Sequence, residues 1–230
     1  MLNKQQDTIK IKVLFVIADS RLGNKIADIY KKDNLPVSFI IHGNGSANSE
    51  TLDFLGLEDT RKVIFISFLT NSKIQHVYEI LQDKLDFNVP GTGIAFTLPI
   101  SSISSVISQL CITAESKMKI ESEGFHMTQN NTYELILTIV SSGYFNQVMD
   151  VAKAAGATGG TLIHARGLGT EEAVRFLGIT IQPEKDIVLI VAPRDKKQSI
   201  MDNITHEVGL ATAGKGICFS IPVETAIGLS

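Results

Sequence analysis

The sequence predicts an α+β fold in which one module occurs twice along the chain. Residues 39–57 align without gaps on residues 161–179, and seven of these 19 positions are identical. Residues 91–99 align in the same way on residues 214–222, with five of nine positions identical. Unrelated segments of average composition share roughly one position in fifteen. Two matching blocks in the same order therefore indicate an internal duplication.

The chain of 230 residues is long enough for two modules of about 100 residues each. We predict a first, diverged module at residues 9–105 and a second module at residues 131–230. Residues 106–130 are mixed in charge and lack strong apolar periodicity at their end. We therefore interpret them as a linker, either without regular structure or with one short helix.

Strand-like and helix-like apolar spacings alternate in the second module. We predict that its second helix begins at Asp195, whose carboxylate would cap the helix together with Gln198. One face of that helix is aliphatic at every fourth position, at Ile200, Ile204 and Val208. The predicted elements are strand 133–140, helix 143–155, strand 161–165, strand 187–192, a helix from 195 onward and strand 217–221.

The first module repeats this pattern. Ser72 and Gln75 predict the same helix cap, and an apolar stripe follows at Val77, Leu81 and Leu85. Its last strand, 94–98, is expected to end at Pro99, as the last strand of the second module ends at Pro222.

The predicted order β-α-β-β-α-β is that of the ferredoxin-like unit, a four-stranded antiparallel sheet with two helices on one face. The fold class is thus α+β with two tandem ferredoxin-like modules. The opposite sheet face would be open and apolar, so we expect the sister module or other chains to cover it. This predicts a homo-oligomer, either a trimer or another pseudo-symmetric assembly.

Composition excludes several classes of protein. Hydrophobic residues make up 44% and charged residues 20% of the chain, as in a globular protein with an ample core. The longest apolar runs, at 13–18 and 187–192, are too short to span a bilayer. The polar N-terminus and the isolated cysteines favour a cytoplasmic location. A net charge of -3 argues against a nucleic-acid partner.

Two glycine-rich segments of the second module, 164–170 and 213–216, are candidates for binding an anion. Backbone N–H groups in such turns form anion sites, and Arg166 and Lys215 would add positive charge, so phosphate is the predicted guest. The alternative is that the glycines only allow tight turns. Neither a P-loop nor a dinucleotide-binding motif is present.

The segment between these strands, 170–186, is long for a connection between paired strands. Such loops often carry function. The alternative is a solvated flap that docks on the core through residues 176–177. Its charged residues are Glu171, Glu172, Arg175, Glu184 and Lys185.

No catalytic or metal site is predicted. The five histidines show no metal-ligand spacing, and we expect a structural role for His42 and His164, which lie at equivalent strand ends. No serine, cysteine or carboxylate stands in a recognisable nucleophile motif. We therefore expect a protein without enzymatic activity, catalytic residues or a resident cofactor.

Two stretches of the second module, GATGGTLIHARGLGTEEAVRFLGITIQPEKDIVLIV and GKGICFSIPVE, resemble the PII nitrogen-regulator family. The first module, with HGNG at 42–45 and GTGIAFTLPI at 91–100, resembles a diverged copy. The family implies a trimeric, ferredoxin-like signal transducer that binds ATP, ADP or another adenine nucleotide, such as AMP or a cyclic nucleotide, in clefts between modules. Its long loop would then dock on a membrane transporter, an enzyme or a transcription regulator.

The resemblance also implies roles for individual residues. Nucleotide contacts would come from the base of the long loop and from the second glycine turn, at Arg166, Gly167, Leu168, Gly169, Thr170, Gly214, Lys215 and Gly216. An anionic nucleotide would draw Arg166 and Lys215 together and order the partner loop, 168–186. The first module has Asn44 for Arg166 and Thr92 for Lys215, so its attraction for phosphate should be weaker. The alternatives are a constitutive protein-binding adaptor without nucleotide, or a metal-handling ferredoxin-like trimer.

Overall fold

The computed structural model describes residues 10–46, 61–89, 91–116, 132–166 and 184–229. The chain divides into two compact units. The first comprises Met1–Ile40, Val63–Gln129 and Glu224–Ser230, and the second comprises Ile41–Lys62 and Asn130–Val223. Each half of the sequence thus supplies a short segment to the unit formed mainly by the other half. The predicted module boundaries are not tested by this division and stay a prediction.

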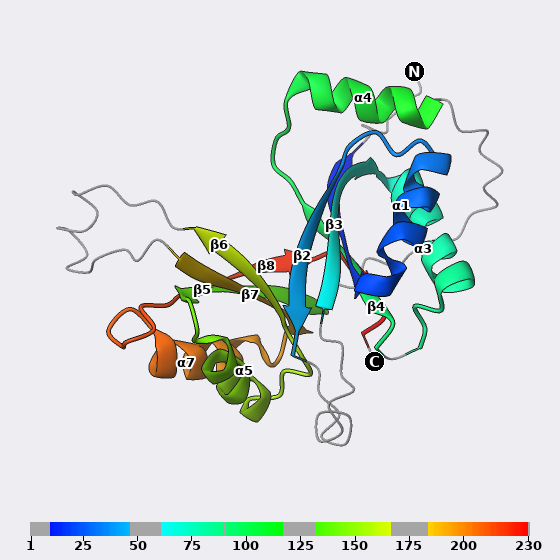
Figure 1. Ribbon diagram of the computed structural model, residues 1–230. Coiled ribbons are helices and arrows are strands. Elements are labelled where there is room, and N and C mark those ends of the chain that lie inside the picture. The colour runs from blue at the N-terminus through cyan, green and yellow to red at the C-terminus, as the bar shows by residue number, and fades with distance from the viewer. Residues whose placement is uncertain (1–9, 47–60, 90, 117–131, 167–183, 230) are drawn as a thin grey trace. The chain divides into compact units, whose positions relative to one another are not determined.

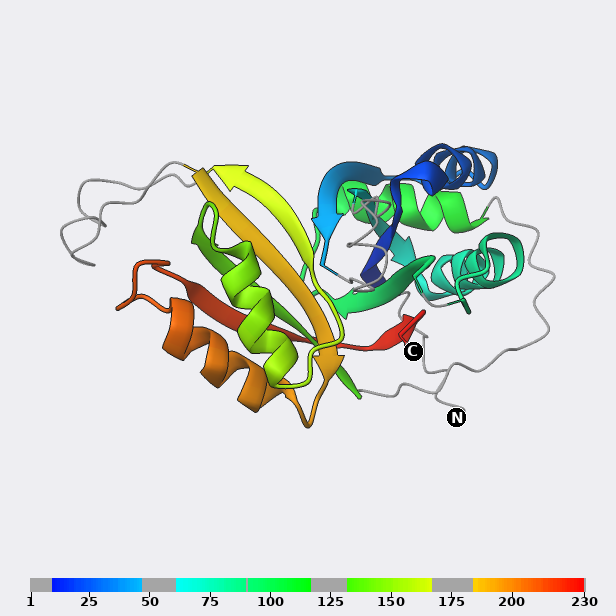
Figure 2. The same cartoon turned by 60° about the horizontal axis from the view of Figure 1, so that its bottom comes forward.

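The second unit is a ferredoxin-like sheet with two helices (Figure 1). Its strand order is β8-β5-β7-β6, and the paired strands run antiparallel. Figure 2 shows the two helices side by side on one face of this sheet. The elements are β5 (Tyr133–Ser141), α5 (Phe145–Ala154), β6 (Thr161–Arg166), β7 (Glu184–Pro193), α7 (Lys197–Val208) and β8 (Ile217–Val223).

The core of the second unit lies between its helices and the sheet. The predicted stripe of α7 is confirmed, since its three aliphatic residues are at most 1% exposed. They pack with one side of β5 and β7 and with the inner face of α5. This side of the sheet is contributed by alternate residues, as strand geometry requires. The core includes Ile136, Val140, Val148, Met149, Ala152, Val188, Ile190, Ile200, Ile204 and Val208.

The first unit repeats this topology. Its strands follow the order β2-β3-β1-β4, and a short ninth strand extends the sheet beyond β4. The predicted stripe on α3, Val77, Leu81 and Leu85, is buried in its core. The elements are β1 (Ile11–Asp19), η1 (Ser20–Leu22), α1 (Gly23–Lys32), β2 (Ser38–Gly45), β3 (Arg61–Thr70), α3 (Asn71–Leu85), β4 (Gly93–Pro99), α4 (Ser105–Ser116) and β9 (Thr225–Ile227).

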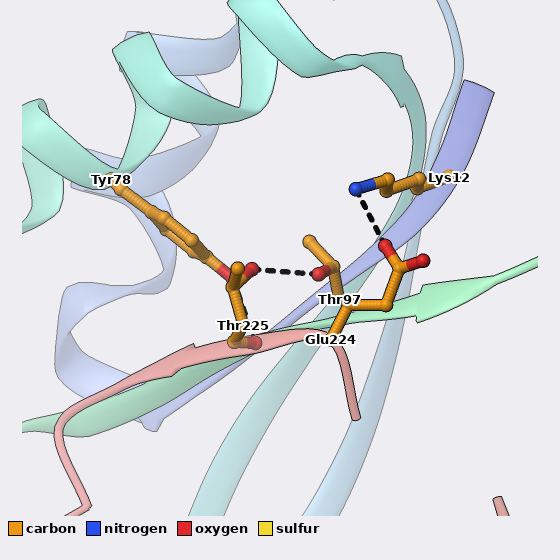
Figure 3. Close-up of polar contacts among 5 residues, drawn as sticks. All are labelled: Lys12, Tyr78, Thr97, Glu224 and Thr225. Carbon is orange, nitrogen blue, oxygen red and sulfur yellow. Dashed lines mark hydrogen bonds and ion pairs between the residues drawn. The ribbon is translucent and has the colours of Figure 1, made fainter. Parts of the chain in front are cut away.

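A polar cluster fastens the C-terminal strand β9 to the first unit (Figure 3). Lys12 Nζ lies 2.5 Å from Glu224 Oε2, and the hydroxyls of Thr97 and Thr225 are 2.7 Å apart. The hydroxyl of Tyr78 donates to the carbonyl oxygen of Thr225 at 3.3 Å. The last residues of the sequence therefore complete the unit that begins with the first strand.

The end of β2 pairs with the edge of the second unit's sheet. Asn44 and Gly45 pair with Leu162 and Thr161 at the edge of β6. Ser46 continues this contact, because its hydroxyl accepts from Gly160 N at 2.7 Å. An edge strand that is covered in this way offers fewer free backbone groups for aggregation.

Both predicted capping boxes are wrong. Helix α7 starts at Lys197 with Lys196 as its N-cap and without a side-chain cap. Asp195 lies in the preceding turn, and Gln198 donates instead to Asp202. In the first unit, the hydroxyl of Ser72 bonds to Glu115 and does not cap α3.

The predicted end of the last strand is also corrected. Strand β8 continues through Pro222 to Val223, whereas β4 ends at Pro99 as predicted. An edge strand tolerates a proline because only one of its sides needs backbone donors, and β8 is the outer strand beside β5.

Candidate functional site

The candidate site lies at one end of the second unit's sheet, where β5 and β6 end and β7 begins. The antiparallel register places Arg166 opposite Glu184 and His164 opposite Asp186. It also places Lys185 opposite Ser141. A cavity of ≈ 820 Å³ opens at this end, a size typical of small-molecule sites. It is lined by Ser142, His164, Ala165, Arg166, Glu184 and Lys185.

Asp186 organises the floor of this site. The residue is only 1% exposed, and its carboxylate accepts three hydrogen bonds. Gly143 N donates to Oδ2 at 2.9 Å, and Ser142 Oγ donates to Oδ1 at 3.3 Å. His164 Nδ1 lies 3.0 Å from the same Oδ1. Because a buried charge is tolerated only with such partners, this carboxylate ties the turn after β5 to the end of β6.

The contact with Asp186 orients the imidazole of His164. A neutral ring in this contact carries its proton on Nδ1, which leaves Nε2 as an acceptor, and a protonated ring offers a donor at both nitrogens. The side chain of His164 is 68% exposed. The ring is thus anchored at one nitrogen and accessible to a ligand in the cavity.

Two basic side chains provide positive charge at the cavity. Lys185 Nζ donates to Ser141 Oγ at 3.3 Å. Arg166 forms no ion pair with another residue that the structure describes. Glu184 contributes one negative charge to the lining. The planar guanidinium of an arginine is well suited to a phosphate or carboxylate group.

The second glycine turn is closed by its own hydrogen bonds. Lys215 N donates to Thr212 O at 3.3 Å, and Gly216 N donates to Val208 O at 2.7 Å. Gly214 N donates to Thr212 Oγ1 at 3.2 Å. The three backbone donors that we expected to contact phosphate are therefore engaged within the protein. The side chain of Lys215 is the part of this turn that offers charge to a ligand.

Close packing explains the glycines of this turn. A Cβ atom at Gly216 would lie 2.3 Å from Val208 O, so no side chain fits there. The left-handed residue is Lys215, with φ 49. The turn is joined to the site's end of the sheet because Ser141 N donates to Gly214 O at 2.9 Å.

The predicted site residues fall into three groups. Arg166, Glu184 and Lys185 line the cavity together. Gly214, Lys215 and Gly216 form the closed turn, which is not part of the lining. The remaining residues lie outside the described part of the chain, namely Gly167, Leu168, Gly169, Thr170, Glu171, Glu172 and Arg175.

Sequence reasoning missed Asp186 and Ser142, and for His164 it favoured a structural role over ligation. The one available signal was an acidic residue at the start of the otherwise apolar run 187–192. The first unit lacks this carboxylate. Strands β3 and β7 are both ten residues long, and Val63 stands at the third position of β3, where β7 has Asp186.

The described residues were also compared with the requirements of metal sites, reactive thiols and membrane spans. Within the described ranges, no three histidine, cysteine or acidic side chains come together as a metal site. Burial raises the pKa of both thiols, Cys111 and Cys218, which disfavours the reactive thiolate. No helix in the described ranges is long and apolar enough to cross a membrane.

Comparison with solved structures finds PII proteins among the matches. A citrate-bound PII from Arabidopsis thaliana is 20% identical, with a TM-score of 0.33, over 43% of this chain and 81% of its own. The ATP complex of GlnK from B. subtilis is 13% identical, with a TM-score of 0.32, over 43% of this chain and 97% of its own. A protein of unknown function from Pediococcus pentosaceus is 12% identical, with a TM-score of 0.31, over 42% of this chain and 96% of its own.

A family model matches the part of the chain that contains the cavity. No curated protein matches the sequence. The family model for nitrogen regulatory protein P-II matches residues 133–230, which include every lining residue of the cavity. Residues 133–230 of the chain are therefore similar to nitrogen regulatory protein P-II.

Proposed function

We propose that the second unit binds a small anionic ligand, an adenine nucleotide, in the cavity where β6 ends and β7 begins. We further propose that binding regulates a partner protein through the segment 168–186. The observation that carries this proposal is the pairing of Arg166 and Lys185 in one cavity of ≈ 820 Å³. These side chains border the segment 167–183 at both of its ends. A ligand held by both would favour one arrangement of that segment over others.

Calorimetric titration of the full-length protein with ATP, ADP, AMP and cyclic di-AMP tests ligand binding. We expect one of these to bind, and the double variant Arg166→Ala/Lys185→Ala to weaken binding at least tenfold through the loss of two charge-assisted contacts. The matched control is Lys31→Ala/Lys32→Ala, which removes the same charge from exposed positions at the end of α1. No binding of any of these nucleotides, or equal weakening by the control, would contradict the proposal.

A separate variant tests the second glycine turn. Lys215→Ala removes the only part of that turn that we expect to reach a phosphate. If the ligand extends from Arg166 to this turn, the affinity falls by several-fold. An unchanged affinity would confine the site to the cavity at β6 and β7.

The alternative of a constitutive protein-binding adaptor is supported by one observation. The three backbone donors of the turn at 214–216 are already satisfied, so this turn needs no anion for its stability. In an adaptor, partner binding would be unaffected by nucleotides and by Arg166→Ala/Lys215→Ala. A pull-down of the same partner with and without ATP separates the two functions.

A homo-oligomer remains part of the proposal. Ile217 and Phe219 of β8 are 47% and 39% exposed. Cys218 between them packs on the helix side of the sheet, so these two side chains lie on the opposite face. Exposed aliphatic and aromatic residues on a sheet face favour association with a second copy of the chain. Light scattering coupled to size exclusion measures the assembly, and a monomer at micromolar concentration would refute it.

A further inference from the structure

His164 lies between a buried acid and an accessible cavity. Its Nδ1 is 3.0 Å from Asp186 Oδ1, while most of its side chain is exposed. Asp186 is itself held in place by Gly143 N and Ser142 Oγ. The carboxylate therefore holds the imidazole in a fixed position beside the cavity.

The charges at the cavity balance when His164 is neutral. Arg166 of β6 and Lys185 of β7 contribute two positive charges, and Glu184 and Asp186 of β7 contribute two negative charges. The turn after β5 contributes the uncharged Ser142. Among the described residues of the site, protonation of His164 changes the net charge from zero to plus one. An anion in the cavity therefore interacts more favourably with the protonated form.

We propose that His164 is a ligand-binding residue. Binding of an anion in this cavity is coupled to the uptake of one proton by the imidazole of His164. The proposal rests on the anion-binding cavity of the proposed function and adds its regulation by pH. Imidazole is the side chain that ordinarily changes charge between about pH 5 and 8. Because the protonated ring is the one that attracts the ligand, binding is tight at the acidic side of this range and weakens as the pH rises.

The ring signals of His164 in NMR spectra test the proposal without knowledge of the natural ligand. The full-length protein is titrated between pH 5 and 8.5 in sodium chloride and in sodium sulfate at equal ionic strength. Sulfate keeps its charge throughout this range and serves as the probe. We expect sulfate to raise the midpoint of the His164 signals by about 0.2 to 0.7 pH unit, the size of one partly exposed charge contact.

The molecule contains its own control. His42 aligns with His164 in the duplication and is exposed, and the first copy has Val63 in place of the acid. The midpoint of the His42 signals should be the same in both salts. A His164 midpoint that does not respond to sulfate, or a response equal to that of His42, overturns the inference.

Nucleotide titrations separate this inference from the proposed function. At pH 6, ATP should bind to the wild-type protein about three- to fivefold more tightly than to His164→Gln. At pH 8, ATP should bind to the two proteins equally tightly. Comparison at each pH removes the effect of protonation of ATP itself. A sulfate response without nucleotide binding would refute the nucleotide function and uphold the inference. Nucleotide binding with the same pH dependence in both proteins would uphold the function and refute the inference.

Discussion

Replacement of Asp186 by alanine should destabilise the second unit, because this carboxylate connects three structural elements. The variant removes the acceptor of Gly143 N at 2.9 Å, of Ser142 Oγ at 3.3 Å and of His164 Nδ1 at 3.0 Å. A hydrogen bond to a charged group contributes about 1.5 to 3 kcal/mol when its geometry is good. The bond from Gly143 belongs to this class, whereas the longer bond from Ser142 and the exposed His164 contribute less.

The expected loss is smaller than the sum of these bonds. Water reaches the released groups of Ser142, Gly143 and His164, and the variant no longer buries a charge. We therefore expect the free energy of unfolding to fall by about 2 kcal/mol. For a unit of this size, that corresponds to a melting temperature lower by about 6 to 10 °C.

Hydrogen exchange measured by mass spectrometry is the suitable assay, because it reports on each unit separately. Amides of β5, β6 and β7 should exchange faster in Asp186→Ala, and those of β1, β3 and β4 should not. Asp195→Ala is the matched control, since Asp195 is exposed and does not cap α7. A change below about 0.5 kcal/mol for Asp186→Ala would refute the reasoning. An equal loss of stability in Asp195→Ala would also refute it, because Asp195 would then stabilise the unit as much as Asp186 does.

Three further predictions concern residues outside the cavity. Gly216→Ala should lower the free energy of unfolding by about 2 to 4 kcal/mol in urea denaturation, because the new Cβ would lie 2.3 Å from Val208 O; wild-type stability would show that the turn opens at little cost. Cys111 is 1% exposed, and burial raises the pKa of its thiol. In the Cys218→Ala variant, Ellman's reagent should therefore modify Cys111 at least tenfold more slowly in the native protein than in the urea-unfolded protein. Equal rates would contradict the burial of Cys111. Burial lowers the pKa of Lys73 in the folded protein. Between this lowered value and the ordinary lysine range near 10.5, the unfolded protein therefore binds more protons at Lys73 than the folded protein does. The stability of the wild-type protein should rise as the pH increases through this range. Lys73→Met should remove this rise. An unchanged pH dependence in urea denaturation would refute the assignment.

Most of the fold could be predicted from the sequence because it depends on local spacing. The stripe Ile200, Ile204 and Val208 lies on one helix face whatever surrounds it, and it is buried as predicted. The helix caps could not be predicted in the same way. A cap depends on which residue leaves the helical conformation first, and the turn before α7 extends one residue past Asp195.

The candidate site was only partly predictable for a related reason. Arg166, Glu184 and Lys185 stand out as charged residues beside glycines and at the ends of a long loop. The bonds of Asp186 join residues that are 22 to 44 positions apart in the sequence. They depend on the register between β5, β6 and β7, and a shift of one residue would turn Asp186 to the other face of the sheet.

The comparison between the two copies gives the strongest reason to regard Asp186 as functional. At the equivalent position, Val63 is 2% exposed and joins the apolar core of the first unit. The fold therefore accepts an aliphatic side chain here without loss of its topology. A buried carboxylate at the same place costs desolvation energy, and such departures from core patterning are expected where a site needs them. The first copy also has Asn44 in place of Arg166, so the acid and the cation are absent together. Their joint presence in the second copy is what a site for an anion beside a protonatable imidazole requires.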